Sequence, residues 1–143
     1  MVIALRAARP GDYGFAKQTY YETMRWIIER LFGWDEERED RKFAQQFKLE
    51  DVRIITADGR DVGWIQTQPA DGALYLGQLY VVPAWQRRGI GSDILTRLLA
   101  EAREQGKALT LSVVKINPAR RFYETRGFRI THDDEYKYHM RHD

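Results

Sequence analysis

The chain has 143 residues, which suits one globular domain with its own hydrophobic core, and we predict that residues 1–143 form that single domain. Apolar residues make up 43% and charged residues 31% of the chain, and no apolar run approaches the ~18 residues that a membrane helix needs. The net charge of +2 argues against nucleic-acid binding, and the absence of cysteine excludes disulfides, thiolate metal sites and a cysteine nucleophile. The sequence starts without a basic leader or a cleavage pattern, so we expect a cytoplasmic protein.

Apolar periodicity and turn residues predict a series of strands and helices along the chain. In chain order we expect a strand at 2–8, helices at 15–31 and 35–47, strands at 52–57, 61–68 and 73–82, a helix at 90–105, a strand at 108–114, a short helix at 118–126, and strands at 128–131 and 135–140. Antiparallel strands are thus followed by a strand–helix–strand unit. This order, β-α-α-β-β-β-α-β-α-β-β, predicts an α/β fold with a mixed sheet flanked by helices.

Two local signals refine this pattern. Asp35 is a suitable N-cap for the second helix, since acids also occupy its first turn. Gly77 lies inside the expected strand at 73–82, which indicates a bulge or the close approach of another backbone or of a ligand.

The segment QRRGIGS at 86–92, between a strand and a helix, has a composition suited to an anion. The first turn of a helix has backbone N–H groups without intrahelical partners, and the helix dipole favours a phosphate there. Its two glycines let the backbone approach a ligand, its arginines add positive charge and its serine adds a donor. It is neither a P-loop, since no Gly-Lys-Ser/Thr follows, nor a Rossmann fingerprint, since the third glycine is missing. We predict a pyrophosphate site, and the alternative is an ordinary solvated helix start.

The wider segment LYVVPAWQRRGIGSDILTRLL at 79–99 resembles motif A of the GNAT superfamily of N-acetyltransferases, which reads Gln/Arg-x-x-Gly-x-Gly/Ala after a strand. Downstream, NPARRFYETRGF at 117–128 is similar to motif B of that family, and the spacing of the two motifs also matches. The resemblance extends from the first strand through Phe128. It implies a GNAT-like acyl-CoA N-acyltransferase fold, with acetyl-CoA (coenzyme A) as co-substrate and no metal.

The resemblance also implies which residues bind the coenzyme. The loop would hold its pyrophosphate, mainly by backbone N–H groups, and the preceding strand would pair with pantetheine. The expected contacts are Leu79, Val81 and Val82 on the strand, Gln86, Arg87, Arg88, Gly89, Ile90, Gly91 and Ser92 in the loop, and Asn117, Arg120 and Tyr123 downstream. Asn117 is also expected to be the N-cap of the short helix, with Pro118 at its first position.

Two residues are candidates for the chemistry. Tyr123 matches the family tyrosine that donates a proton or a hydrogen bond to the departing thiolate, and its alternative role is a core tyrosine beside Phe122. A thiol titrates near ~8.5 and a tyrosine near ~10, so full proton transfer is uphill by roughly 2 kcal/mol and a hydrogen bond is the expected role. An amine acceptor with a pKa of ~10.4 needs a base. Some family members carry a glutamate on the strand before motif A, but residues 75–80 hold no carboxylate, which leaves Glu22 or a water relay.

The family places its acceptor pocket between the first and second strands, and here that region is rich in aromatic residues, most of which we expect to pack between helices. Its bulky and basic members are Tyr20, Tyr21, Met24, Arg25, Trp26 and Trp34. The acidic run DEERED at 35–40 reads first as a solvated face, although its acids at 35–37 would attract an ammonium group.

These observations predict an N-acetyltransferase that moves an acetyl group from acetyl-CoA directly to a primary amine of a small molecule or a peptide, in a ternary complex. The absence of cysteine fits direct transfer, because no enzyme thioester can form. One alternative is a non-catalytic acyl-CoA-binding regulatory domain, which the missing strand carboxylate leaves open. Another is a nucleic-acid-binding module, against which the low net charge counts. We expect no membrane partner, and either a monomer or a homodimer.

Overall fold

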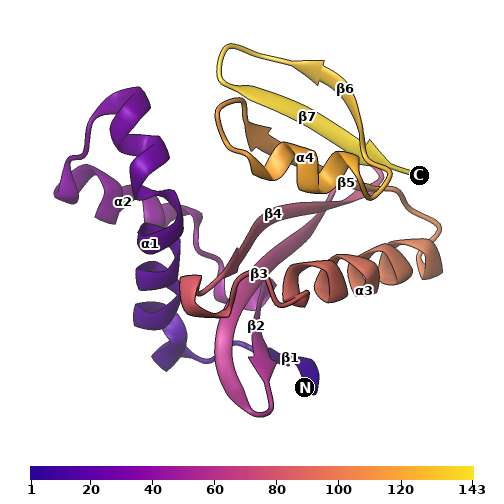
Figure 1. Cartoon of the computed structure of the whole chain (residues 1–143), viewed down its shortest axis with the longest axis horizontal. Helices are drawn as coiled ribbons and strands as arrows, with labels where there is room; N and C mark the ends of the chain where they lie inside the picture. The colour runs from indigo at the N-terminus through magenta and orange to yellow at the C-terminus, as the bar shows by residue number, and fades with distance from the viewer. The chain divides into compact units, whose positions relative to one another are not determined.

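The computed structural model describes all residues, 1–143, and its helices and strands follow the predicted order (Figure 1). The elements are β1 (Ile3–Ala7), α1 (Tyr13–Phe32), α2 (Glu36–Gln46), β2 (Val52–Ala57), β3 (Arg60–Ala70), β4 (Ala73–Val81), α3 (Ile90–Glu104), β5 (Leu109–Val114), α4 (Ala119–Glu124), β6 (Arg129–Asp133) and β7 (Lys137–His142). Asp35 caps α2 as predicted, since its side chain accepts a hydrogen bond from the Arg38 N–H. The predicted α/β class and element order are confirmed.

The strands form a mixed seven-stranded sheet in the order β1-β2-β3-β4-β5-β7-β6. The β4–β5 pair is parallel and runs from Leu74↔Leu109 to Leu76↔Leu111, whereas β1–β2, β2–β3, β5–β7 and β6–β7 are antiparallel. A parallel pair requires a crossover connection, and α3 supplies it between β4 and β5.

The chain forms two compact units. Unit 1 comprises Met1–Gln66 and Gln78–Asp93, and unit 2 comprises Thr67–Gly77 and Ile94–Asp143. Three elements, β3, β4 and α3, pass from one unit into the other, so the chain crosses between the units within regular structure. The single domain expected from the chain length stays a prediction.

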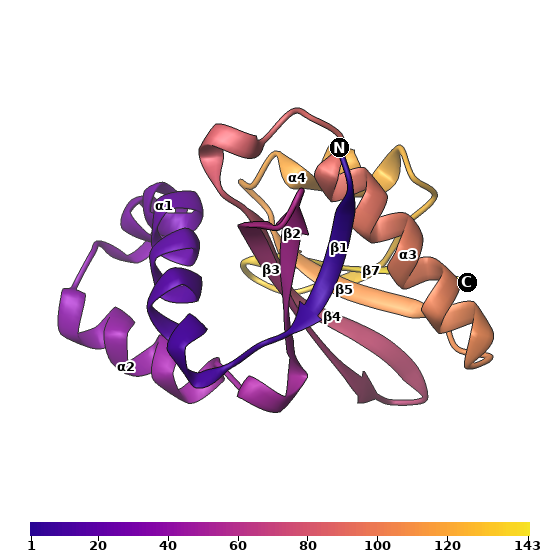
Figure 2. The ribbon, with the colours of Figure 1, turned by 90° about the horizontal axis from the view of Figure 1, so that it is seen from below.

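Aromatic rings build the core of unit 1, where α1 and α2 lie side by side next to the strands (Figure 2). Trp64 of β3 is fully buried, and its indole N–H donates to the carbonyl oxygen of Ala16 in α1 at 3.0 Å. Its ring lies 6.0 Å from that of Phe43, 5.7 Å from that of Phe47 and 5.3 Å from that of Tyr80. Elements far apart in the sequence therefore meet at one side chain.

A close backbone approach in this sheet occurs at Gly63, and the bulge or close approach expected at Gly77 stays a prediction. A Cβ on Gly63 would lie 2.2 Å from the carbonyl oxygen of Tyr80, so only glycine fits there. Gly77 is exposed. Gly63 also lies inside a predicted strand. A glycine within a strand indicates a close approach of another backbone, so the sequence carried this signal at Gly63 as well.

Unit 2 buries one face of α3 and one face of β5. The buried side chains of this part of α3 are Ile94, Leu95, Leu98 and Ala102. In β5 the alternate residues Leu109, Leu111 and Val113 are buried, as a strand with one face in the core requires. The helix α4 contacts β7, since the guanidinium of Arg120 lies 4.6 Å from the ring centroid of Tyr138.

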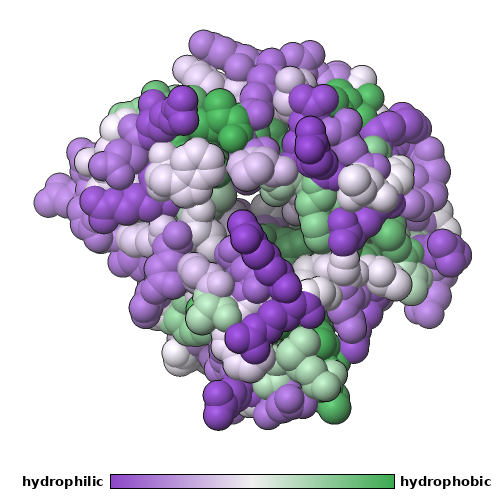
Figure 3. Space-filling model, viewed as in Figure 1, coloured by the Kyte–Doolittle hydropathy of each residue, from purple (hydrophilic) through white to green (hydrophobic).

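The surface is largely polar. Hydrophilic residues cover most of the face drawn in Figure 3, with hydrophobic residues in scattered patches. The largest exposed apolar side chains of α1 are Trp26 and Phe32. None of the helices is both long and apolar enough to cross a membrane.

A partly buried ion pair links the start of α1 to the sheet in unit 1. Arg6 of β1 donates to both carboxylate oxygens of Asp12 at 2.9 Å, and the Arg9 N–H donates to the same carboxylate at 2.8 Å. Arg6 also donates to Asp61 of β3 at 3.1 Å. The guanidinium of Arg6 is the main cause that lowers the pKa of Asp12 from 3.8 to about 2.

We therefore predict that Asp12→Asn removes part of the acid sensitivity of folding. The unfolded chain binds a proton at Asp12 near pH 4 and the folded chain near pH 2, so the stabilisation is present above pH 4 and is lost as the pH falls to 2. It amounts to roughly 2 kcal/mol. Urea unfolding of the wild type between pH 7 and pH 2 should show this loss, and the variant should lack it. The exposed turn variant Asp71→Asn is the control, and an equal pH slope in all three proteins would contradict the assignment.

Candidate functional site

The loop between β4 and α3 in unit 1 is held by its own side chains. A 3-10 turn spans Pro83–Trp85, and the side-chain amide of Gln86 donates to the carbonyl oxygen of Val81 at 2.9 Å. The guanidinium of Arg88 lies 4.8 Å from the ring centroid of Trp85. The Gln86 side chain therefore links the loop to β4 by a hydrogen bond. The indole of Trp85 orients the Arg88 guanidinium through a cation–π contact.

The backbone of this loop alternates in handedness. Arg87 has a φ of 64° and Gly89 a φ of 82°, while Arg88 between them has a negative φ. Such alternation turns successive backbone N–H groups toward one side and makes an anion-binding concavity. For Arg87 the left-handed conformation costs on the order of 1 kcal/mol, which the surrounding hydrogen bonds must offset.

Gly89 is required by its backbone angle. A Cβ at this position would meet no protein atom within 4 Å, so the protein itself does not exclude a side chain, and the predicted room for a ligand stays a prediction. A φ of 82° is accessible to glycine at little cost and to other residues only with strain.

The start of α3 presents a positive helix end. The N–H of Asp93 makes the first helical hydrogen bond, to the Gly89 carbonyl at 3.0 Å, so the N–H groups of Gly89, Ile90 and Gly91 have no acceptor within the helix. The side chain of Ile90 is buried, which anchors this turn in the core. The exposed arginines of the loop add formal positive charge to the helix dipole. The arrangement can bind a phosphate or a pyrophosphate through backbone donors.

Backbone groups of both Val81 and Val82 already have partners within unit 1, since the Val81 carbonyl accepts from the Gln86 side-chain amide. The Val82 N–H donates to the Val62 carbonyl at 2.8 Å, and the Val82 carbonyl accepts from the Trp85 N–H at 2.8 Å. Both groups are therefore used inside unit 1, so a backbone contact between Val82 and pantetheine would compete with these bonds, and the contact stays a prediction. Because strand residues alternate sides, Leu79 and Val81 direct their backbone groups away from β3. The register of β5 on β4 comprises only Leu74, Tyr75 and Leu76, so it does not occupy them.

In unit 2, Asn117 and Arg120 have structural partners. The Asn117 side-chain oxygen accepts a hydrogen bond from the Ala119 N–H at 2.9 Å, which confirms its capping role, although α4 begins at Ala119 and not at Pro118. The Arg120 guanidinium donates to Glu124 at 2.9 Å and stacks on Tyr138. A coenzyme contact by Arg120 would have to compete with these two interactions.

Tyr123 of α4 packs among rings in unit 2. Its ring centroid lies 5.3 Å from that of Phe122 and 5.7 Å from that of Phe128. Burial raises the pKa of Tyr123 to about 12. A phenol with this pKa lies about 3.5 units above a thiol, so complete proton transfer to a thiolate is uphill by about 5 kcal/mol. The hydrogen-bond role is therefore favoured more strongly than the sequence suggested.

The residues of α1 and α2 that the sequence singled out lie partly in the core and partly on the surface. Glu22 is exposed and accepts a hydrogen bond from the Gln18 amide at 2.9 Å. Tyr20 and Tyr21 pack on the ring of Phe43, at centroid distances of 5.5 Å and 6.5 Å, as expected for helix-packing residues. The acidic run does not form a uniform solvated face, because Glu39 is only 1% exposed. The sequence analysis missed this burial, although Glu39 lies four residues before the apolar Phe43 and therefore on the same face of the helix.

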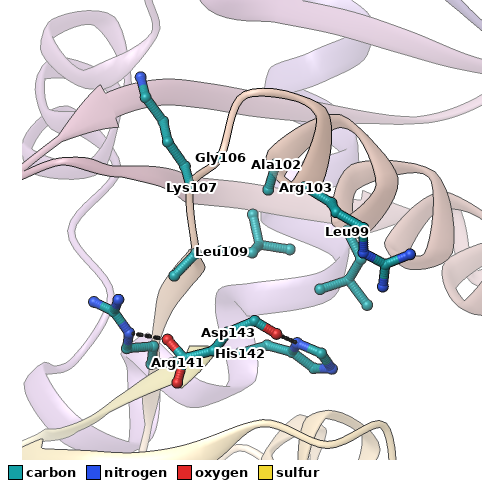
Figure 4. A pocket seen from close by; sticks show the side chains of 10 residues that line it. Leu99, Ala102, Arg103, Gly106, Lys107, Leu109, Arg141, His142 and Asp143 are labelled. Carbon is teal, nitrogen blue, oxygen red and sulfur yellow. Dashed lines mark hydrogen bonds and ion pairs between the residues drawn. The ribbon is translucent and has the colours of Figure 1, made fainter.

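Unit 2 carries a cavity of about 310 Å³ at the C-terminal end of α3 (Figure 4). Its walls are formed by Leu99, Ala102, Arg103, Gly106, Lys107, Ala108, Leu109, Arg141, His142 and Asp143. In Figure 4 the Lys107 side chain extends away from the leucines, and Arg141 pairs with Asp143. None of the predicted site residues lines this cavity. No group of three or more His, Asp or Glu side chains is placed to hold a metal ion.

A family model described as an acetyltransferase (GNAT) domain matches residues 29–142. The chain belongs to the GNAT family of acetyl-CoA-dependent N-acetyltransferases. The match extends over both sequence motifs and most of both units. Comparison with curated protein sequences gave no significant match.

Solved structures confirm the GNAT fold along the whole chain. PaiA N-acetyltransferase from Thermoplasma acidophilum, determined in complex with coenzyme A, is 20% identical, with a TM-score of 0.80 over 99% of this chain and 98% of that one. An acetyltransferase from Thermus thermophilus is 19% identical, with a TM-score of 0.76 over 99% and 97%. An N-acetyltransferase from Staphylococcus aureus is 16% identical, with a TM-score of 0.74 over 96% and 98%.

The loop of this GNAT acetyltransferase fits the co-substrate that the family uses. The pyrophosphate of coenzyme A is a doubly charged anion, and the loop combines alternating backbone N–H groups, a helix N-terminus and two exposed arginines. The edge of β4 adds backbone donors and acceptors of the kind that an amide chain such as pantetheine requires.

We predict that Gly89→Ala lowers the free energy of unfolding by about 1 kcal/mol, because alanine at a φ of 82° is strained. Urea denaturation would measure the change. Gly11→Ala is the matched control, since Gly11 has neither a positive φ nor an atom within 4 Å of an added Cβ. Equal stability of the two variants would show that the loop backbone relaxes and does not need glycine at position 89.

Proposed function

We propose that this chain transfers the acetyl group of acetyl-CoA directly to a primary amine, on a small molecule or a peptide, within a ternary complex. The proposal rests chiefly on the anion-binding end of α3, where the loop at 86–92 alternates in handedness and precedes three N–H groups without helical partners. The absence of cysteine supports direct transfer, since the chain cannot form a thioester of its own. We propose that residues 1–143 act together as one domain in this reaction.

In this proposal the loop and the β4 edge bind the coenzyme. Backbone N–H groups of Gly89, Ile90 and Gly91 hold the pyrophosphate, with Ser92 adding its hydroxyl and the loop arginines their charge. Leu79 and Val81 pair with pantetheine through their backbone groups. Gln86 keeps the loop against β4 through its bond to the Val81 carbonyl. Asn117 and Arg120 are secondary contacts, because both already have partners within unit 2.

Acetyl-CoA supplies an activated thioester carbonyl when it is bound. The protein then has to assist at two places, the sulfur of the departing thiolate and the nitrogen of the incoming amine, which must lose its proton. Tyr123 stabilises the departing thiolate by donating a hydrogen bond from its phenol, which burial keeps protonated at neutral pH. The proton of the incoming amine goes to solvent through Glu22 or through a water relay. The exposed carboxylate of Glu22 already accepts a hydrogen bond from the Gln18 amide, which favours the relay.

Isothermal titration calorimetry with acetyl-CoA, coenzyme A and NADH tests the anion site directly. We expect micromolar binding of the two coenzyme A species and none of NADH. Gly91→Glu should abolish that binding, because a side chain and a negative charge enter the phosphate site. Unchanged affinity of Gly91→Glu would refute the site, and a screen of amines with intact coenzyme binding but no turnover would refute the transferase function alone.

Tyr123→Phe should lower kcat by about 10²-fold or more while leaving the affinity for acetyl-CoA nearly unchanged. The phenylalanine keeps the ring packing on Phe122 and Phe128 and removes only the hydroxyl. Steady-state kinetics and calorimetry on the same preparation separate the two quantities. Phe122→Tyr, which changes the neighbouring ring, is a control for general effects of packing, and an unaltered kcat in Tyr123→Phe would leave Tyr123 with a packing role only.

A further inference from the structure

The cavity of unit 2 at the C-terminal end of α3 combines an apolar wall with a basic rim (Figure 4). Its volume of about 310 Å³ falls at the lower end of the range that small-molecule sites occupy. None of the residues proposed to bind acetyl-CoA or to act in the transfer lines it. The cavity is therefore a separate place in the molecule, which the proposed acetyl transfer does not use.

The apolar wall comes from one face of α3 and from the start of β5. Ala102 and Leu109 are buried, and Leu99 is half-buried. Leu99 and Ala102 lie three residues apart on α3 and therefore on the same face of the helix. The part of Leu99 that stays exposed is apolar surface inside a cavity, and covering it with an apolar group is favourable.

The charged side chains around the cavity are mainly basic. Three cationic side chains line it together with a single carboxylate, and these are Arg103, Lys107, Arg141 and Asp143. The Asp143 carboxylate accepts hydrogen bonds from Arg141 at 2.6 Å and from Arg129 at 2.9 Å, so its negative charge is compensated. The side chains of Arg103 and Lys107 make no hydrogen bond or ion pair within the chain. The rim thus carries positive charge without a counter-charge.

Two carbonyl groups at this end of α3 already have partners. The last carbonyls of a helix lack intrahelical donors and, with the helix dipole, favour a cation. Here the Ala102 carbonyl accepts from the Lys107 N–H at 2.9 Å, and the Arg103 carbonyl accepts from the Gly106 N–H at 3.0 Å. Gly106 makes this closure with a φ of 66°. These acceptors are therefore used inside the chain, and the free charge of the rim favours an anion.

We propose that this cavity binds a small organic monocarboxylate, whose apolar body lies against Leu99 and whose carboxylate pairs with the guanidinium of Arg103. Arg103 follows Leu99 by one helical turn, so the two side chains project from the same side of α3. A planar guanidinium and a carboxylate can form two parallel hydrogen bonds. The Lys107 side chain extends away from the leucines in Figure 4, so it adds positive charge at the rim and makes no direct contact.

Hexanoate and hexanamide test the proposal, because they share size and apolar chain and differ in charge. An NMR titration of the whole chain with hexanoate should shift the amide signals of Gly106, Lys107 and Leu109, with a Kd of about 1 mM or below. Hexanamide should bind at least tenfold more weakly, since it cannot form the charged pair. Acetate and inorganic phosphate carry charge without the apolar chain and should also bind at least tenfold more weakly.

Three variants separate the contributions of charge and apolar wall. Arg103→Gln should weaken hexanoate binding by roughly 10- to 100-fold and leave hexanamide binding unchanged, because it removes the charge from an exposed position. Leu99→Ala should weaken the binding of both hexanoate and hexanamide, because both use the apolar wall. Arg97→Gln makes the same change of charge on α3 outside the cavity, and this control should behave as wild type.

Equal binding of hexanoate and hexanamide would overturn the proposal, because the basic rim would then play no part. Equal binding of hexanoate and phosphate would also overturn it, because the apolar wall would then contribute nothing. Absence of shifts at the cavity, or an unchanged affinity in Arg103→Gln, would leave Arg103 and Lys107 with the stabilisation of the α3 C-terminus alone. The titrations contain no acetyl-CoA and no amine, so their outcome is independent of the proposed acetyl transfer.

Discussion

The buried indole of Trp64 holds the elements of unit 1 against one another. Trp64 belongs to β3. Its indole N–H donates to the Ala16 carbonyl of α1, and its ring contacts those of Phe43 and Tyr80. An indole buries a large apolar area and has a single donor, so it packs stably only where a carbonyl meets that donor. The position of α1, and through Phe43 that of α2, follows from this one side chain.

This aromatic assembly gives a physical reason for the composition of α1 and α2. Helices that pack through Tyr, Phe and Trp rings meet in flat faces with few rotamers, so the two helices are held in one arrangement. The same packing buries Glu39 and keeps its Oε1 away from solvent.

The proposed phosphate site depends on backbone geometry more than on side chains. Arg87 and Gly89 adopt left-handed conformations, and Ile90 fixes the first turn of α3 in the core. The polarity of Gln86 and the charge of Arg88 indicate ligand contacts in the sequence. In the fold, Gln86 donates a hydrogen bond to the Val81 carbonyl and Arg88 stacks on Trp85. A site built in this way is preorganised, since its N–H groups already point to one side before an anion arrives. The strain at Arg87 is balanced by these neighbouring contacts.

The sequence by itself determined the order of strands and helices and the GNAT family. Those features depend on local periodicity, on glycines and caps, and on two motifs that stand within short stretches of chain. Only the tertiary structure decided which of the residues singled out in the sequence already have partners elsewhere in the chain. It showed that the Val82 N–H is hydrogen-bonded to the Val62 carbonyl, that Gly63 meets the backbone of Tyr80, and that Glu39 lies in the core and not on the acidic surface. Each of these outcomes depends on a partner distant in sequence, and hydrogen bonding, close packing and burial between distant segments have no signature in a local pattern.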